Sequence, residues 1–362
     1  MKILVTGGSG FIGTNLIELL HSKGYDILNF DIKIPQIRSH QRYWRAIDLR
    51  DFEAMFALAS QFKPTHIVHL GARTDLLGSA ADSASYDSNT VGVENIIKII
   101  ERVPGINRTI FASSRLVFDI STPPKHELDF SPRTQYGRSK VAGEMLVREK
   151  LLNKHIWTIV RPTSIWGPWF GEPYLNFFKL VHKGLFIYPG KKVIRKNYGF
   201  VGNAVDQLLT ILLSEAEAVA QKTMFLTDEP FDLMSWVKLI ENKSNAPKVP
   251  VLPVSCLKIL ARIGDALKYV GVKPPLTSFR LNNILSDVLY DTSLTEKICG
   301  NAKNSLEQGV EQTIQWMVNQ KIIEVKSLNY PGMKDVNNEK YKLNPEGKKQ
   351  IFASVDAHSK SE

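Results

Sequence analysis

The beginning of the chain changes abruptly from an apolar run to a glycine-rich one. Residues 2–6 have the length and composition of a buried strand, and the sequence Gly-Gly-Ser-Gly-Phe-Ile-Gly fills positions 7–13 directly after it. Apolar side chains then recur at helical spacing within residues 12–22. The sequence therefore predicts a strand, a tight glycine-rich turn and a helix at the start of the chain.

The regularly spaced glycines suit the binding of a dinucleotide. Gly7 and Gly10 allow the backbone to turn sharply and to approach a diphosphate, and Gly13 allows the helix to lie close to the strand. The free N–H groups and the positive dipole end of the helix can then hold the phosphate charge. We include Phe11 and Ile12 in this site because they stand at the start of the helix.

An acidic residue follows where a dinucleotide site needs one. Asp31 closes the apolar run 27–31 and can accept hydrogen bonds from the ribose hydroxyls. Because its carboxylate would repel a 2′-phosphate, we predict NAD rather than NADP as the cofactor, with Lys33 as the nearby residue that could soften this preference. The alternative is a glycine-rich turn without a ligand, and the strand, the helix and Asp31 together argue against it.

The spacing Gly-x-x-Gly-x-x-Gly resembles that of the extended short-chain dehydrogenases/reductases, the NAD-dependent epimerase/dehydratase family of nucleotide-sugar epimerases, dehydratases and reductases. The similarity covers roughly residues 1–320. The further segments that match the family, in chain order, are Asp48-Leu49, His66–Ala72, Asn89, Phe111–Ser114, Tyr136–Lys140, and Arg161-Pro162 followed by Gly167-Pro168.

The resemblance implies further contacts with the cofactor. Asp48 and Leu49 match the pair that contacts the adenine ring, and Asn89 matches an asparagine on a helix of this group. Gly71 stands where the family usually has alanine. The turn that would line the cofactor consists of Leu70, Gly71 and Ala72.

Ser114, Tyr136 and Lys140 are of the types needed for hydride transfer. Ser114 stands at the end of the fifth predicted strand, and the other two follow it in the chain. Tyr136 and Lys140 are four residues apart on a predicted helix, so both side chains project from one face. The lysine ammonium favours the phenolate, as would the positive charge of a nicotinamide, and we expect the pKa of Tyr136 to fall from about 10 toward neutrality. Tyr136 could then remove a proton from a substrate hydroxyl that Ser114 orients. The resemblance adds that Lys140 holds the nicotinamide ribose.

The substrate half carries weaker signals. Ser164 stands where several 4-epimerases have a phosphate-binding asparagine. In the family, an arginine near the basic run that follows Pro189-Gly190 pairs with the substrate diphosphate, so Arg195 or Lys196 could take that role. The alternative for this run is a solvated loop.

Two departures from the family bear on the reaction. Arg115-Leu116 follows Ser114 where sugar dehydratases have an Asp-Glu pair, so dehydration loses its acid and its base. Neither Cys256 nor Cys299 lies near the core motifs, which argues against epimerisation next to a keto group by a Cys/His pair. In the lobe, Ser164 and the pair Gly202-Asn203 also depart from the family pattern, and with these substitutions a 4-epimerase of the galactose type stays open.

Two enzymatic functions and one non-enzymatic function stay open. We favour epimerisation of a nucleotide-diphosphate sugar through a transient keto intermediate, because the lobe is basic and no membrane-spanning segment occurs. The alternative is an NAD(P)-dependent dehydrogenase or reductase that releases the keto product, because residues 251–277 resemble the C-terminal part of 3β-hydroxysteroid dehydrogenase-like proteins. A regulator that binds NAD without activity is disfavoured by the intact Ser114, Tyr136 and Lys140.

Predicted strands alternate with predicted helices at the rhythm of a parallel sheet, which indicates an α/β fold. We expect a doubly wound Rossmann core at residues 1–165, with the catalytic residues, and a smaller mixed C-terminal substrate lobe at 166–326. A helix at about 203–214 would return to the core, and a polar, flexible tail would occupy 327–362. The expected core strands are 2–6, 27–31, 44–48, 66–71, 108–113 and 156–161, and the expected helices are 12–22, 51–61, 87–102, 136–154, 203–214, 232–242 and 255–270.

Composition excludes several other classes of protein. The 362 residues are 43% hydrophobic and can bury a large core, and no block of Lys and Arg with interleaved aromatic residues accompanies the net charge of +10. The two cysteines lack the spacing of a metal or redox site. Because the chain starts with a strand rather than a secretory leader, we expect a cytoplasmic protein with reduced thiols. We also predict a small-molecule substrate, no metal, and no nucleic-acid or membrane partner, and we allow for a homodimer.

Overall fold

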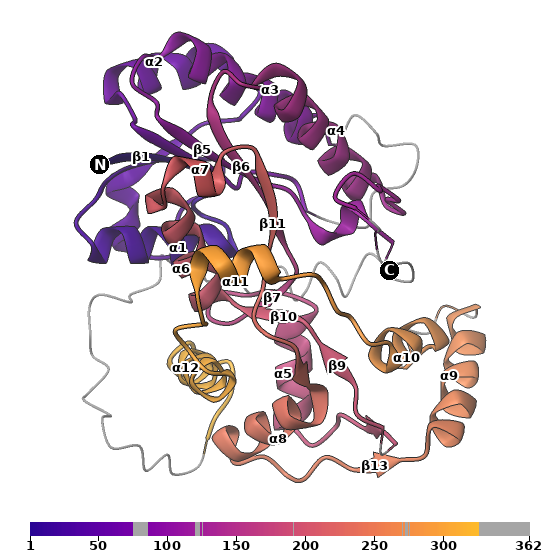
Figure 1. Ribbon diagram of the computed structural model, residues 1–362. Coiled ribbons are helices and arrows are strands. Elements are labelled where there is room, and N and C mark those ends of the chain that lie inside the picture. The colour runs from indigo at the N-terminus through magenta and orange to yellow at the C-terminus, as the bar shows by residue number, and fades with distance from the viewer. Residues whose placement is uncertain are drawn as a thin grey trace.

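The computed structural model shows a layered α/β core with a second lobe below it (Figure 1). The tail expected at 327–362 lies outside the described residues. The structure describes residues 1–74, 86–119, 124, 126–190, 192–269, 271, 274 and 276–325.

The core is a seven-stranded sheet with the strand order β11-β6-β5-β4-β1-β2-β3, in which every neighbouring pair is parallel. This order, with the chain winding outward from β1 in both directions, confirms the doubly wound Rossmann fold expected from the sequence. The strand expected at 44–48 is shorter in the structure, where it covers Trp44–Ala46. The strands are β1 (Lys2–Thr6), β2 (Asp26–Asp31), β3 (Trp44–Ala46), β4 (His66–His69), β5 (Arg108–Ala112), β6 (Ile156–Pro162) and β11 (Lys222–Leu226).

Helices cover both faces of the sheet (Figure 1). Side chains of a strand alternate between the two faces, so Ile3 and Val5 pack in one core while Leu4 packs in the other. The helix expected at 136–154 ends at Lys150. The helices on one face are α1 (Phe11–Ser22) and α6 (Val201–Leu213), and those on the other are α2 (Phe52–Phe62), α3 (Asp87–Arg102) and α4 (Gln135–Lys150).

The second lobe combines short strand pairs with helices around an aromatic core. Trp236 is buried and packs against Trp166, Phe177 and Phe178. The strand pairs are β7 (Ser164–Trp166) with β10 (Tyr198–Phe200), β9 (Arg195–Lys196) with β12 (Phe231–Asp232), and β8 (Tyr188–Pro189) with β13 (Val251–Leu252). The helices that complete the chain are α5 (Tyr174–His182), α7 (Ala216–Val219), α8 (Leu233–Ser244), α9 (Val254–Tyr269), α10 (Ser278–Leu285), α11 (Ser293–Cys299) and α12 (Leu306–Asn319).

The glycine-rich turn between β1 and α1 brings three backbone segments into contact. Gly7 has a φ of +71°, a conformation that L side chains rarely adopt. A Cβ on Gly13 would come within 2.2 Å of the Gly7 carbonyl oxygen, so only glycine lets α1 lie this close to the turn. A Cβ on Gly7 would come within 2.7 Å of Gly71 Cα, after β4. The turn therefore needs glycine at positions 7 and 13, because a Cβ at either position would come too close to neighbouring backbone atoms.

Candidate functional site

The site forms at the carboxyl ends of the parallel strands, where ligands bind in folds of this type. At the end of β1, α1 begins at Phe11, and its N-cap residue Gly10 has no side chain that could cap the first N–H groups. At Gly10, among the residues that the structure describes, only the Gly7 carbonyl oxygen, 3.2 Å away, lies within 4 Å of the place a Cβ would occupy. The N–H groups of the first helical turn, which includes Phe11 and Ile12, thus face an open cradle that fits a diphosphate.

Asp31 ends β2 directly beside this cradle. One carboxylate oxygen accepts a hydrogen bond from the Ser9 N–H at 3.0 Å, and the other accepts one from the Lys33 N–H at 2.9 Å. Burial raises the pKa of Asp31 above its usual value, although these hydrogen bonds oppose the rise. The carboxylate stands next to the phosphate cradle, which is the place that the sequence assigned to ribose recognition.

The predicted adenine contacts and the turn that would line the cofactor follow β3 and β4. Asp48 pairs with Arg50 at 2.6 Å, and that hydrogen bond lowers the pKa of Asp48. Leu49 is buried, and a Cβ on Gly71 would come within 2.6 Å of its side chain. A side chain at position 71 would therefore require Leu49 to move. The turn Leu70–Ala72 follows β4 directly, and Leu70 N–H donates to the Thr6 carbonyl oxygen.

Asn89 on α3 connects the β4 loop to α4. Its side-chain oxygen accepts a hydrogen bond from the Arg73 N–H at 2.7 Å, while its amide group donates to the Arg73 carbonyl oxygen at 3.0 Å and to the Ser139 hydroxyl at 2.9 Å. Asn89 is almost fully buried, so these bonds satisfy a polar group that water does not reach. Asn89 therefore fixes the distance between the cofactor-lining loop and the helix that carries Tyr136.

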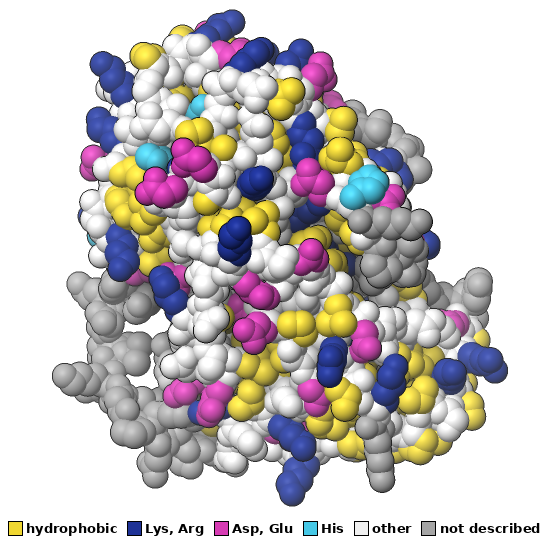
Figure 2. Space-filling view, in the orientation of Figure 1, with side chains coloured by type: hydrophobic (Ala, Val, Ile, Leu, Met, Phe, Trp, Pro, Cys, Tyr) yellow, Lys and Arg dark blue, Asp and Glu magenta, His cyan; other side chains and the backbone are white. Residues whose placement is uncertain are grey.

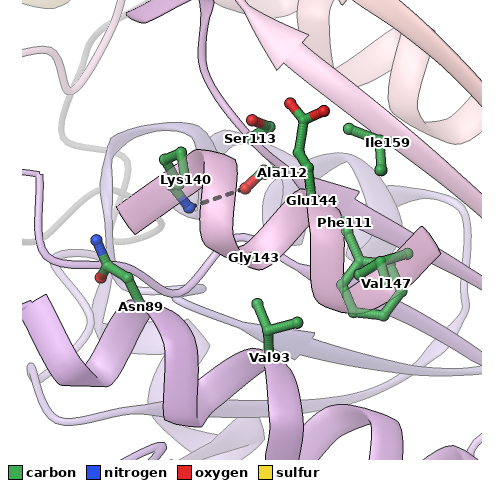
Figure 3. Close-up of a pocket in the computed structure, with 10 residues that line it drawn as sticks. All are labelled: Asn89, Val93, Phe111, Ala112, Ser113, Lys140, Gly143, Glu144, Val147 and Ile159. Carbon is green, nitrogen blue, oxygen red and sulfur yellow. Dashed lines mark hydrogen bonds between the residues drawn. The ribbon is translucent and has the colours of Figure 1, made fainter. Parts of the chain in front are cut away.

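The structure brings Ser114, Tyr136 and Lys140 together. Ser114 follows β5, and its side chain hydrogen-bonds the Tyr136 side chain in the first turn of α4. Lys140 lies one turn further along α4, where its ammonium donates to the Ala112 carbonyl oxygen at 2.8 Å (Figure 3). The ammonium nitrogen lies 5.9 Å from the centre of the Tyr136 ring. The three side chains are all buried.

Burial dominates the pKa values of this group. It raises the pKa of Tyr136 to about 12, against the effect of the Ser114 hydrogen bond, and it lowers the pKa of Lys140 to about 8, against the charge of Glu144. The expectation that Lys140 brings the pKa of Tyr136 toward neutrality is therefore wrong for the protein by itself. The physical reason is that both groups are desolvated and the ammonium is directed at the Ala112 carbonyl group instead of the phenol.

Behind this group, α3, α4 and the sheet enclose a cavity of about 10 Å³, about the space that one water molecule needs (Figure 3). Asn89, Ser113, Lys140 and Glu144 supply its polar atoms. The Ser113 hydroxyl is buried and has no hydrogen-bond partner among the described residues. The cavity is too small for a substrate.

A second polar cluster borders the site from the lobe. Arg115 follows Ser114 and donates to the Tyr290 hydroxyl at 3.5 Å. The Tyr174 hydroxyl hydrogen-bonds the side chains of Ser164 and Tyr198. Burial raises the pKa of Tyr174, Tyr198 and Tyr290, and the positive charge of Arg115 opposes that rise in all three. Arg115 and these tyrosines, with Ser164, are hereafter the Arg115–tyrosine cluster.

The two basic residues predicted to bind a diphosphate have different surroundings. Lys196 is buried, and its ammonium donates to the carbonyl oxygens of Asn283 at 2.9 Å and Ser286 at 2.5 Å. Burial lowers the pKa of Lys196 to about 8, against the charge of Asp287, and the charge of Arg115 adds to the lowering. Lys196 thus holds α10 in place, whereas the Arg195 side chain is exposed on β9.

The sequence did not single out Tyr174, Tyr198 or Tyr290, and it singled out Arg115 only for the acidic pair that it replaces. The three tyrosines come from separate segments, α5, β10 and the chain after α10, so no local spacing connects them. Their shared feature, proximity to Arg115, exists only in the folded chain.

A family model described as "NAD dependent epimerase/dehydratase family" matches residues 3–223. This chain belongs to that family. Membership confirms the resemblance recognised in the sequence, makes the protein an enzyme and makes NAD its cofactor, in agreement with the cradle and Asp31 described above.

Relatives and solved structures extend the similarity over most of the chain. N-acetyl-alpha-D-glucosaminyl-diphospho-ditrans,octacis-undecaprenol 4-epimerase of Escherichia coli O157:H7 is 26% identical over 87% of this chain and 95% of its own length. UDP-glucose 4-epimerase of Vibrio cholerae is 27% identical over 87% of this chain and 94% of its own. The crystal structure of UDP-glucose 4-epimerase with UDP-glucose from Thermotoga maritima has the same fold, with a TM-score of 0.68 and 21% identity, over 89% of this chain and all of that one.

The described residues lack two kinds of feature. In that part of the chain, no group of three or more His, Cys, Asp or Glu side chains is arranged to hold a metal ion. Among the same residues, no helix has both the length and the apolar character needed to cross a bilayer.

The lowered pKa of Lys140 gives a prediction about stability. Because the pKa is about 8 in the folded protein and 10.5 in its usual state, the unfolded chain binds more protons between these values, and stability should rise with pH there. Relative to Lys140→Met, the wild-type protein should gain about 2 to 3 kcal/mol of unfolding free energy between pH 7 and 10. Urea denaturation of both proteins at each pH measures this difference. Parallel pH profiles for the two proteins would mean that Lys140 keeps an ordinary pKa.

Proposed function

We propose that the protein epimerises a secondary alcohol of a nucleotide-diphosphate sugar, at C4, through a transient keto intermediate. The observation that carries this proposal is the Arg115–tyrosine cluster, which borders Ser114 and Tyr136. A guanidinium group and several hydroxyl groups can pair with the charged and hydroxylated parts of such a substrate. The names of the two relatives, both 4-epimerases, support the same reaction.

Bound NAD supplies a hydride acceptor that can return the hydride to the same carbon. Ser114 holds the reacting oxygen by a hydrogen bond, and Tyr136 takes the hydroxyl proton as the carbon is oxidised to a ketone. When the ketone is reduced on its opposite face, Tyr136 returns the proton to the oxygen. The proton and hydride balance over the cycle, so the substrate changes configuration without net oxidation. Because the pKa of Tyr136 is about 12 in the protein alone, proton removal relies on further positive charge close to the phenol.

The residues also support the proposed cofactor contacts. The cradle at Phe11 and Ile12 holds the diphosphate, Asp31 accepts the ribose hydroxyls and favours NAD over NADP, and Lys140 reaches the nicotinamide ribose. Asp48, Leu49 and the turn Leu70–Ala72 border the adenine side. Asn89 acts by positioning that turn against α4.

The alternative is a dehydrogenase of the 3β-hydroxysteroid type that releases its keto product. A sterol offers one hydroxyl group and an apolar body, so it would cover Arg115 and the tyrosine hydroxyl groups without hydrogen-bonding most of them. Covering charged and polar groups without a hydrogen bond from the ligand costs binding energy. The polar lining of the cluster therefore favours the sugar substrate.

The first test compares the two reactions directly. The purified protein should contain bound NAD, and incubation with a panel of UDP-sugars should give a 4-epimer with no net reduced cofactor in solution. Tyr136→Phe should abolish turnover and leave bound NAD nearly unchanged, because only the proton acceptor is lost. Stoichiometric cofactor reduction with a sterol, together with no reaction of any nucleotide sugar, would establish the dehydrogenase instead.

The second test concerns the cluster. Arg115→Met should raise KM for the diphosphate sugar by about 10- to 100-fold, the loss expected when a charged hydrogen bond disappears, while NAD content stays constant. Arg195→Met is the matched control, since its side chain is exposed on β9 and was the alternative diphosphate ligand. A large KM effect from Arg195→Met and none from Arg115→Met would mean that the substrate diphosphate binds at Arg195 on β9 instead.

A further inference from the structure

Helix α9 carries an apolar stripe that the described part of the fold leaves exposed. One face packs inward through Leu257 and Ala261, which contact Leu281 of α10. A second apolar stripe, at positions separated by three and four residues, faces solvent instead. Its members, with their exposed fractions, are Ile259 (61%), Leu260 (45%), Ile263 (52%) and Leu267 (40%), and Phe279 of the neighbouring helix α10 is 73% exposed. The four residues of α9 are hereafter the α9 stripe.

Basic residues accompany the α9 stripe. Lys258 and Arg262 are exposed and stand one turn apart on the polar side of the same helix. Figure 2 shows hydrophobic side chains interspersed with Lys and Arg at the lower right, where Figure 1 places α9 and α10. Between residues 245 and 286 the sequence has a single acidic residue, Asp265, against Lys248, Lys258, Arg262, Lys268, Lys273 and Arg280.

The apolar stripe and the basic residues together indicate the kind of surface that α9 binds. An exposed apolar stripe with Lys and Arg beside it is the pattern of a helix that lies in the plane of a membrane interface, with apolar side chains among the acyl chains and cations at the anionic headgroups. In a dimer formed through this face, Lys258 and Arg262 of one copy would lie opposite the same cations of the other copy. Repulsion between these like charges disfavours self-association through this face. We propose, in contrast to the expectation from the sequence that the protein has no membrane partner, that α9 docks the protein on the surface of an anionic phospholipid bilayer.

The docking surface is connected to the substrate side of the molecule. The end of α10 is held by Lys196, through the carbonyl oxygens of Asn283 and Ser286. Tyr290 of the Arg115–tyrosine cluster follows Leu285, the last residue of α10, by five residues, a span of at most about 17 Å. A docked protein would thus hold its substrate cluster close to the bilayer. This proposal concerns location and does not rest on the proposed reaction, and a helix on the surface needs no spanning segment.

Vesicle sedimentation with the full-length protein tests this proposal. Vesicles of phosphatidylcholine with about a third of phosphatidylserine should bind the protein at least tenfold more tightly than pure phosphatidylcholine vesicles do. Ile259→Gln with Ile263→Gln should reduce binding to the anionic vesicles at least tenfold, since glutamine suits a helix but not the acyl region. Lys258→Glu with Arg262→Glu should reduce it similarly and weaken its salt dependence.

Matched controls separate the α9 stripe from other surfaces. Leu152→Gln removes a side chain that is 53% exposed after α4, and it should leave vesicle binding unchanged. All variants keep the lysines of the segment after residue 325, so binding through that segment would persist in every one of them. Wild-type binding that the α9 variants do not change, or no binding at all, would overturn the proposal. A dimer in sedimentation velocity that the isoleucine variant dissociates would assign the stripe to self-association instead.

Discussion

Arg161 on β6 and Glu144 on α4 form a two-pronged ion pair, with distances of 2.9 and 2.7 Å, that is almost fully buried. Removing Glu144 would leave the Arg161 guanidinium in the interior without its carboxylate, so the pair tolerates little change in the position of α4 on the sheet. One turn before Glu144, the Lys140 ammonium donates to the Ala112 carbonyl oxygen of β5. These two attachments fix the rotation of α4, and the rotation of α4 brings Tyr136 to Ser114.

The same constraint explains how the two halves of the molecule cooperate. The core supplies the cradle, Asp31 and the reactive group, all at the carboxyl ends of parallel strands. The lobe supplies the tyrosines that meet Arg115 beside Ser114. Arg115 is the residue directly after Ser114, so the position of its positive charge is tied to the position of Ser114. This charge is the reason for proposing a polar, anionic substrate over a uniformly apolar one.

The sequence predicted those features that depend on residues close together in the chain. The glycine-rich turn, Asp31 at the end of β2, and Tyr136 and Lys140 one turn apart all follow from local spacing. Features that depend on burial were not predictable in this way. The raised pKa of Tyr136 and the attachment of Lys196 to α10 both follow from desolvation and from carbonyl groups distant in sequence. The start of α6 is a similar case. The N–H of its N-cap residue, Phe200, donates to the Asp228 carboxylate at 2.7 Å, and Asp228 is distant in sequence from the helix start expected at 203.

The central claim is that the hydride removed from the substrate carbon returns to that same carbon. Turnover of the UDP-sugar that proves to be the substrate, carried out in D2O and followed by NMR at C4, tests this claim most directly. The account predicts that the epimerised product keeps protium at C4, because the hydrogen never exchanges with solvent. Deuterium at C4 of the product would show that the reaction proceeds by proton removal and return, and would contradict the assigned roles of Ser114, Tyr136 and Lys140.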